Sequence, residues 1–237
     1  MQDQSRFGAL VLGIGLVLGL SSLGYLLGKA ALSVKALERT VVVKGLSERE
    51  VPANVAAWPI SFQVASNDLE EVYRSIETRS AIILSFLSGY GVSAQEVTLS
   101  PPEVTDLLAQ QWGEKDNIPF RYAGNAVVTV YSDNVAAVRK AMANVVGLGK
   151  QGVAISGGQG MSQFLFTGLN DLKPEMVREA TENARAVAEK FAQDSNSRLG
   201  RIKSARQGQF SIEDRDTTTP FIKKVRVVST VEYYLSD

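Results

Sequence analysis

The chain has 237 residues with 25 basic and 25 acidic side chains, so its formal net charge is zero, and it contains neither cysteine nor histidine. The lack of cysteine excludes disulfides, thiol nucleophiles and thiolate metal sites, and the lack of histidine excludes the usual general base and the Ser-His-Asp triad. Because basic residues are not in excess, the composition argues against nucleic acid as a partner.

An uncharged apolar run from Phe7 to Leu27 lies near the start of the chain, with Arg6 before it and Lys29 after it. A helix of this length rises about 30 Å, the thickness of the hydrocarbon core of a bilayer. The run therefore predicts a transmembrane helix or uncleaved signal anchor over residues 7–28, through which the chain contacts a membrane.

The segments on either side are predicted to be an N-terminal flank at residues 1–6 and a linker at residues 29–39. A cleaved secretory signal is the alternative to an anchor, with Val34 and Ala36 as its cleavage pattern. The apolar run is longer than the apolar part of such signals, which favours the anchor. Since Lys29, Lys35 and Arg39 follow the run, the charges alone favour a cytoplasmic C-terminal part.

Residues 40–237 are enough for one large or two small domains with a core of their own. Apolar side chains recur at helical spacing in three segments, and β-branched or alternating segments lie between them. Strands are expected near residues 40–47, 58–64, 96–100, 105–111, 120–131, 153–156, 162–168, 201–207 and 221–235, and helices over 67–88, 134–145 and 174–199.

Several residues mark the predicted helix ends. Asn67 with Glu70 forms a capping-box pattern for the first helix, and Asp133 or Asn134 caps the second. Pro174 occupies the first turn of the third helix, which Gly200 ends. The apolar face of this third helix is mostly alanine and allows a close approach to a sheet; it comprises Val177, Ala180, Ala184, Val187, Ala188 and Phe191.

Helices separate groups of strands instead of alternating singly with them. This order predicts an α+β fold with a largely antiparallel sheet and about three packed helices, preceded by one transmembrane helix.

Three motifs resemble binding sites. The segment Gly147–Gly152 matches G-x-G-x-x-G, but a helix precedes it and a strand follows it, the reverse of a dinucleotide site, so we interpret it as a flexible connection. Gly157–Gly160 lacks the Lys-Ser/Thr of a phosphate loop and is interpreted as a turn. The segment Ile212–Asp216 gathers three carboxylates, which favours a solvated loop over a divalent-ion site because the spacing of a calcium loop is missing. We therefore predict no cofactor and no metal.

Three aromatic residues are candidates for partner contact. Trp112 lies beside a polar loop, where exposure is tolerated. Tyr122 and Tyr131 lie on the strong strand over residues 120–131. A pocket edged by these side chains would favour ligand binding.

Several segments in order resemble the SIMPL-domain family over about residues 40–236. They are Gly45–Glu48 with Val51–Ala53, Leu87–Val92, Phe120–Asn125, Gln163–Phe166 with Leu169, and the alanine ladder Ala180, Ala184, Ala188 and Ala192 with Arg185, followed by Leu199–Gly200. The resemblance implies an α+β domain behind a signal or anchor, facing the periplasm or cell exterior, against the direction that the charges favour. It further implies assembly into rings, as in some members, and links to envelope or oxidative stress tolerance, with no catalytic residue set.

The sequence thus predicts a non-enzymatic envelope protein, anchored in the inner membrane by a single helix, whose exported α+β domain forms homo-oligomers or binds a partner. Capture of a peptide, glycan or small molecule in a cleft is the alternative. A hydrolase without histidine, using a Ser-Lys pair or paired carboxylates, is a third hypothesis.

Overall fold

The computed structural model describes residues 2–36, 39–109, 119–156 and 162–236. The chain divides into two compact units. Unit 1 comprises residues 1–48, 174–210 and 226–237, and unit 2 comprises residues 49–173 and 211–225. Both units combine helices with antiparallel strands, which confirms the α+β prediction. Residues 40–237, predicted as one α+β domain, are thus shared between the two units.

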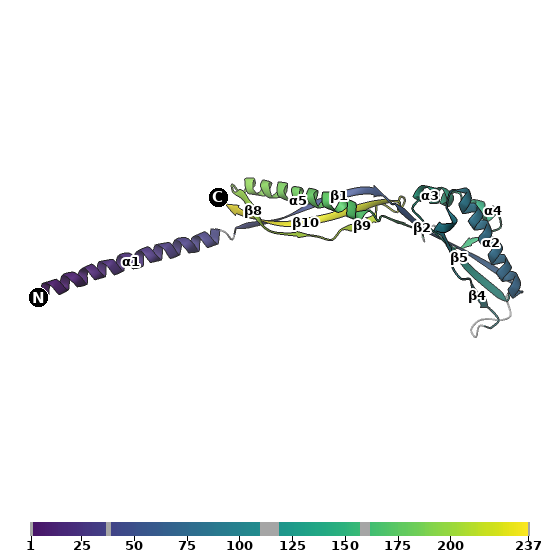
Figure 1. The fold of residues 1–237 in the computed structure, drawn as a ribbon, viewed down its shortest axis with the longest axis horizontal. Coiled ribbons are helices and arrows are strands. Elements are labelled where there is room, and N and C mark those ends of the chain that lie inside the picture. The colour runs from purple at the N-terminus through teal and green to yellow at the C-terminus, as the bar shows by residue number, and fades with distance from the viewer. Residues whose placement is uncertain (1, 37–38, 110–118, 157–161, 237) are drawn as a thin grey trace. The chain divides into compact units, whose positions relative to one another are not determined.

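The N-terminal helix α1 (Gln2–Ala36) contains the predicted apolar run. Among the residues whose side chains are described, Gly13–Ser33 form a segment long and apolar enough to cross a membrane, and none of it is buried (Figure 1). The helix continues to Ala36, so most of the segment expected to be a linker is helical. The reason is local, because residues 29–36 are rich in alanine, leucine and lysine, which favour helix.

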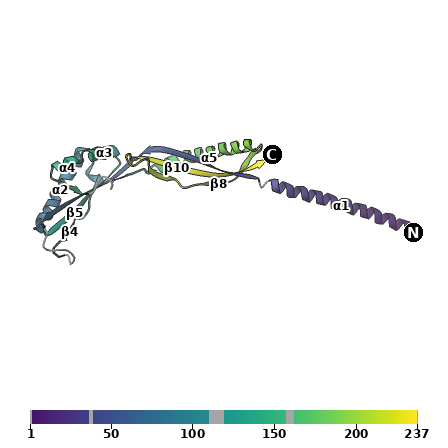
Figure 2. The same ribbon diagram turned by 180° about the vertical axis from the view of Figure 1, so that it is seen from behind.

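The sheet of unit 1 has the strand order β1 (Thr40–Pro52), β10 (Ile222–Ser236) and β8 (Arg198–Gln207). Strands β10 and β8 run antiparallel, with Thr230 opposite Arg206. The short β9 (Ser211–Asp214) pairs with the beginning of β10 in unit 2. Helix α5 (Leu169–Asp194) lies along the strands (Figures 1 and 2). Its Ala184 and Ala188 share a buried cluster with Val43 of β1 and with Val231 and Tyr233 of β10. Apart from α1, the described part of unit 1 is therefore a sheet covered by α5.

The alanine ladder of α5 is confirmed. Its buried residues recur every four positions: Met176, Ala180, Ala184, Ala188 and Ala192. A Cβ placed on Gly45 of β1 would lie 1.9 Å from the carbonyl oxygen of Ala180 and 2.3 Å from the amide nitrogen of Ala184. Strand and helix backbones thus touch directly at Gly45, which only glycine permits.

Val187 and Phe191 are the part of the predicted α5 face that was wrong, since these side chains are 41% and 57% exposed. Steps of four residues advance 400° around a helix, so the buried stripe drifts by about 40° per step. The stripe follows the twist of the sheet, and this drift leaves Val187 and Phe191 beside it.

The predicted ends of α5 were also wrong. The helix begins at Leu169, so Pro174 lies inside it and not in its first turn. It ends because Asn196 adopts a positive φ of 52°, while the Ser197 N–H donates to the carbonyl of Ala192 at 2.8 Å. Asn is one of the residues that tolerate this left-handed conformation, so Gly200 is not needed as the stop.

The sheet of unit 2 is built on β2 (Val55–Ser66) and β5 (Tyr122–Ser132), which pair antiparallel with Ile60 opposite Val128. β3 (Val97–Leu99) and β4 (Glu103–Asp106) pair with β5, and β6 (Ile155–Ser156) and β7 (Gln163–Leu165) pair with β2. The other elements are helices α2 (Leu69–Gly89), α3 (Val135–Ala143) and α4 (Val146–Lys150) and the 3₁₀ turn η1 (Ala94–Glu96).

The core of unit 2 lies between this sheet and its helices. Even-numbered residues of β2 and β5 point into it, and those at its centre, Ile60, Phe62, Val128 and Val130, are fully buried. Helix α4 covers residues 147–150 of the G-x-G-x-x-G segment, and Gln151 and Gly152 form a turn. Most of the segment is therefore helical and not a flexible connection, and its Leu148 is fully buried.

The helix caps of unit 2 partly follow the prediction. Asn134 caps α3 by accepting from the Ala137 N–H at 3.1 Å, as expected. For α2 the prediction was wrong, since Asp68 accepts from the Glu70 N–H at 2.9 Å, whereas the Asn67 side chain accepts from the Arg121 N–H at 2.9 Å. A partner distant in sequence thus takes the side chain that local spacing assigned to the cap.

Candidate functional site

Two of the three predicted contact residues, Tyr122 and Tyr131, lie on β5. Trp112 lies outside the described residues. Tyr122 is half-buried against the core of unit 2, with the Arg121 guanidinium 4.9 Å from its ring centre. Tyr131 is 56% exposed on the opposite face of β5, because their positions differ by an odd number and successive strand residues point to opposite faces.

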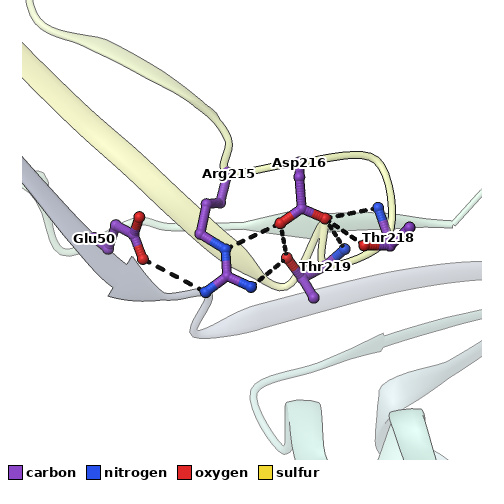
Figure 3. A network of polar contacts seen from close by, with 5 residues as sticks. All are labelled: Glu50, Arg215, Asp216, Thr218 and Thr219. Atoms are coloured by element: carbon purple, nitrogen blue, oxygen red, sulfur yellow. Dashed lines mark hydrogen bonds and ion pairs between the residues drawn. The ribbon is translucent and has the colours of Figure 1, made fainter.

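The carboxylate-rich segment at residues 212–216 leads from β9 (Ser211–Asp214) into an internally bonded turn at residues 215–219. Figure 3 shows Arg215 between Glu50 at 3.5 Å and Asp216 at 3.0 Å, with a further bond to the Thr219 hydroxyl at 2.9 Å. The Asp216 carboxylate accepts from the backbone N–H groups of Thr218 and Thr219 at 2.8 and 2.7 Å, and from both of their hydroxyls.

These contacts satisfy the Asp216 carboxylate with donors from the chain itself. Hydrogen bonds from Thr218, Thr219 and Arg215 lower the pKa of Asp216 below its ordinary value. Asp214 pairs with Lys223, whose residue is only 8% exposed. Among the described residues, no group of three acidic side chains is placed to hold a metal ion. The turn therefore has a structural explanation. Of residues 212–216, expected to be a solvated loop, residues 212–214 belong to β9 and only Arg215 and Asp216 lie outside the strand.

A cleft of about 640 Å³ adjoins this turn in unit 2. Arg139 and Met142 of α3 line one side, Phe164 follows from β7, and Thr218 and Phe221 come from the turn. The Arg139 guanidinium lies 3.4 Å from the centre of the Phe221 ring, and the Phe221 carbonyl accepts from the Ala53 N–H at 2.9 Å. A cation held over an aromatic ring at the wall of a cleft is suited to binding an anionic or flat group.

A second concave surface lies in unit 1, between α5 and β8. This groove has a volume of about 650 Å³ and is lined by Arg185 and Glu189 of α5, Leu199, Arg201 and Ile202 of β8, and Tyr233 of β10. Arg185 and Glu189 form an ion pair at 2.9 Å. Ile202 is 50% exposed although it lies opposite Tyr233 on the helix-facing side of the sheet, so the single helix leaves β8 uncovered.

The tyrosine in this groove has an unsatisfied hydroxyl. Tyr233 is 3% exposed, and its buried hydroxyl has no hydrogen-bond partner among the described residues. Burial raises the pKa of this phenol, Glu189 adds to the rise and Arg185 opposes it. An unsatisfied buried polar group costs free energy, and this hydroxyl carries that cost in the folded unit.

The outward surface of α5 carries a separate apolar patch of Val187 and Phe191, bordered by Ala186, Lys190 and Asp194. Such a patch on a helix surface is suited to contact with another protein.

Sequence reasoning missed the cleft and the groove because each is assembled from segments far apart in the chain. One signal for the groove was present: the segment 198–207 carries four basic residues and no acidic one.

The family comparison agrees with the resemblance. The family model named SIMPL, described as a protein of unknown function (DUF541), matches residues 41–233. No curated protein matches the chain.

Proposed function

Since the chain belongs to the SIMPL family, we propose that it is a membrane-anchored, non-enzymatic envelope protein whose α+β part, residues 40–237, lies outside the cytoplasm and assembles with further copies of the chain. The main observation that supports this proposal is that the segment Gly13–Ser33 of α1 is apolar and entirely unburied. Exposing so many large apolar side chains to water is unfavourable, and a bilayer removes that cost.

The patch of Val187 and Phe191 supports self-association. Both side chains are exposed beside an alanine stripe that is fully occupied by the sheet, so they are free to pack against a neighbour. A role in envelope or oxidative stress tolerance belongs to this proposal through the family resemblance. The absence of cysteine and histidine favours a binding or structural role over catalysis.

Two experiments test this proposal. Alkaline phosphatase or green fluorescent protein fused after Asp237 reports the side of the membrane on which the C-terminal part lies. We expect the phosphatase fusion to be active and the green fluorescent protein fusion to be non-fluorescent. Light scattering after size exclusion of the full chain in detergent reports assembly. Phe191→Gln is expected to weaken assembly, whereas Tyr73→Gln, which alters a 45% exposed aromatic side chain on α2, is the matched control. A fluorescent C-terminal fusion, or a strict monomer at high concentration, would contradict the proposal.

Ligand capture is the second candidate, favoured by the cleft beside Arg139 and Phe221. Because the guanidinium faces the ring, its N–H edges are available to an anionic group of a peptide, glycan or small molecule. A short acetylated peptide with a free carboxylate, titrated by calorimetry against the full chain and against Arg139→Gln, tests this function. Equal binding to both proteins, or none to either, would argue against it.

A further inference from the structure

The groove between α5 and β8 is an apolar channel with charged walls. Its floor consists of Leu199, Ile202 and Tyr233, and ion pairs of α5 run along one side. Its volume of about 650 Å³ lies within the usual range for ligand sites. The groove therefore has room for an apolar chain and a wall that polar groups can contact.

Strand β8 gives the groove a positive rim. It carries Arg198, Arg201, Lys203 and Arg206 and no acidic residue, in a chain of zero net charge. Lys203 pairs with Glu232 at 3.0 Å, while Arg201, which lines the groove, forms no ion pair with a described residue. The uncompensated charge on this rim is complementary to an anionic headgroup.

The chain also limits the distance between this groove and the apolar segment of α1. The Arg39 guanidinium donates to the Ser197 hydroxyl at 3.2 Å, and the Arg39 carbonyl accepts from the Leu235 N–H at 2.8 Å. Leu235 lies opposite Leu199 in the sheet. From Ser33 to Ala36 the chain rises three residues along α1, and from Ala36 to Arg39 it can extend by three residues more. The Cα atoms of Ser33 and Arg39 are therefore at most about 15 Å apart. The end of β8 that carries the groove is thus held close to wherever Ser33 meets the lipid headgroups.

We propose that this groove holds one acyl chain of an anionic phospholipid drawn from the bilayer that α1 spans. The acyl chain lies against Leu199, Ile202 and the ring of Tyr233, and the headgroup meets Arg201. The inference rests on the membrane anchorage of the proposed function and adds the ligand class and its site.

Photo-crosslinking tests this site in the full chain. The protein is reconstituted into nanodiscs of phosphatidylcholine, either alone or mixed with phosphatidylglycerol. Each preparation contains a trace of one lipid probe with a diazirine on its acyl chain, and the probe is either phosphatidylglycerol or phosphatidylcholine. Adducts are located by peptide mass spectrometry. We expect adducts on α5 and β8 around the groove, in addition to those on α1, only with the anionic probe.

Two pairs of variants make the test specific. Arg201→Gln is expected to lower the groove adducts about fivefold, the factor equivalent to one charge near an anionic surface, whereas Arg206→Gln, which does not line the groove, leaves them within about twofold. Ile202→Glu, at a 50% exposed position, abolishes them, and Val42→Glu, at a 62% exposed position of the same sheet, does not.

Several results would overturn the inference. Adducts confined to α1 refute the groove and leave the anchor intact. Equal groove labelling by the phosphatidylcholine probe refutes the role of the anionic headgroup. Labelling that appears only when a free diazirine fatty acid is supplied to the chain in detergent refutes the bilayer as the source. A chain that fails to enter nanodiscs refutes both the anchor and this ligand.

Discussion

Replacing Gly45 by alanine is expected to separate β1 from α5. The added Cβ would lie 1.9 Å from the Ala180 oxygen and 2.3 Å from the Ala184 nitrogen, which are both backbone atoms. No change of side-chain rotamer relieves these contacts, so helix and strand must move apart by about 1 Å, a gap that forfeits a quarter to a half of each dispersion contact across it.

The expected cost follows from this separation. Overpacking a core costs about 1–3 kcal/mol, and a backbone-to-backbone clash belongs at the upper end. We expect a loss of about 3 kcal/mol, equivalent to an opening equilibrium about 100-fold more favourable. The affected residues are the small core of unit 1, which includes Val43, Ala188, Val231 and Tyr233.

Hydrogen exchange with mass spectrometry is the suitable assay, because it measures α5 and β1 separately from unit 2. Gly45→Ala should increase exchange in α5 and β1 and leave α2 and β5 protected. Gly89→Ala is the control, since a Cβ at Gly89 meets nothing within 4 Å. The double variant Gly45→Ala with Ala184→Gly should not recover, since the clashing atoms of residue 184 are backbone. Unchanged α5 protection in Gly45→Ala would refute the reasoning.

Three further outcomes are expected. Gly91 follows α2 with a φ of 89°, so Gly91→Ala should destabilise unit 2 by about 1 kcal/mol in urea unfolding, and an unaltered midpoint would contradict this. Asn134→Ala should cost about 1 kcal/mol through loss of the α3 cap, while Asn134→Asp keeps it; hydrogen exchange at the start of α3 distinguishes the two. The pKa of Asp216 is lowered from 3.8 by its hydrogen bonds, so its stabilisation is complete above that value and is lost as the pH falls through the lowered pKa. An NMR titration of the Thr219 amide should show this transition, and a similar transition in Asp216→Asn would exclude Asp216 as its cause.

Features that depend on backbone geometry alone were predictable. The apolar run within α1 was recognised because a rise of about 1.5 Å per residue fixes the length that spans a bilayer, although the helix extends beyond the predicted residues 7–28. The alternation of buried residues in β5 follows from the two-residue period of strands. The Asn134 cap and the alanine ladder of α5 are likewise local patterns, confirmed in the structure. The site was less predictable. The cleft and the groove each join segments far apart in the chain, whereas the placement of Tyr122 and Tyr131 on two faces of β5 follows from the odd spacing of their positions.

The sequence by itself determined that a long apolar helix precedes antiparallel sheets with packed helices, because the rise of a helix and the side-chain period of each element are local properties of the chain. It also determined that cysteine and histidine chemistry is absent. Only the tertiary structure decided that β10 lies between β1 and β8, that Asn67 contacts Arg121 instead of capping α2, and that β8 is left uncovered beside α5. Each of these depends on contacts between residues far apart in the chain. Local propensity does not distinguish between alternative partners for such contacts, so packing and hydrogen bonding in the folded chain select among them.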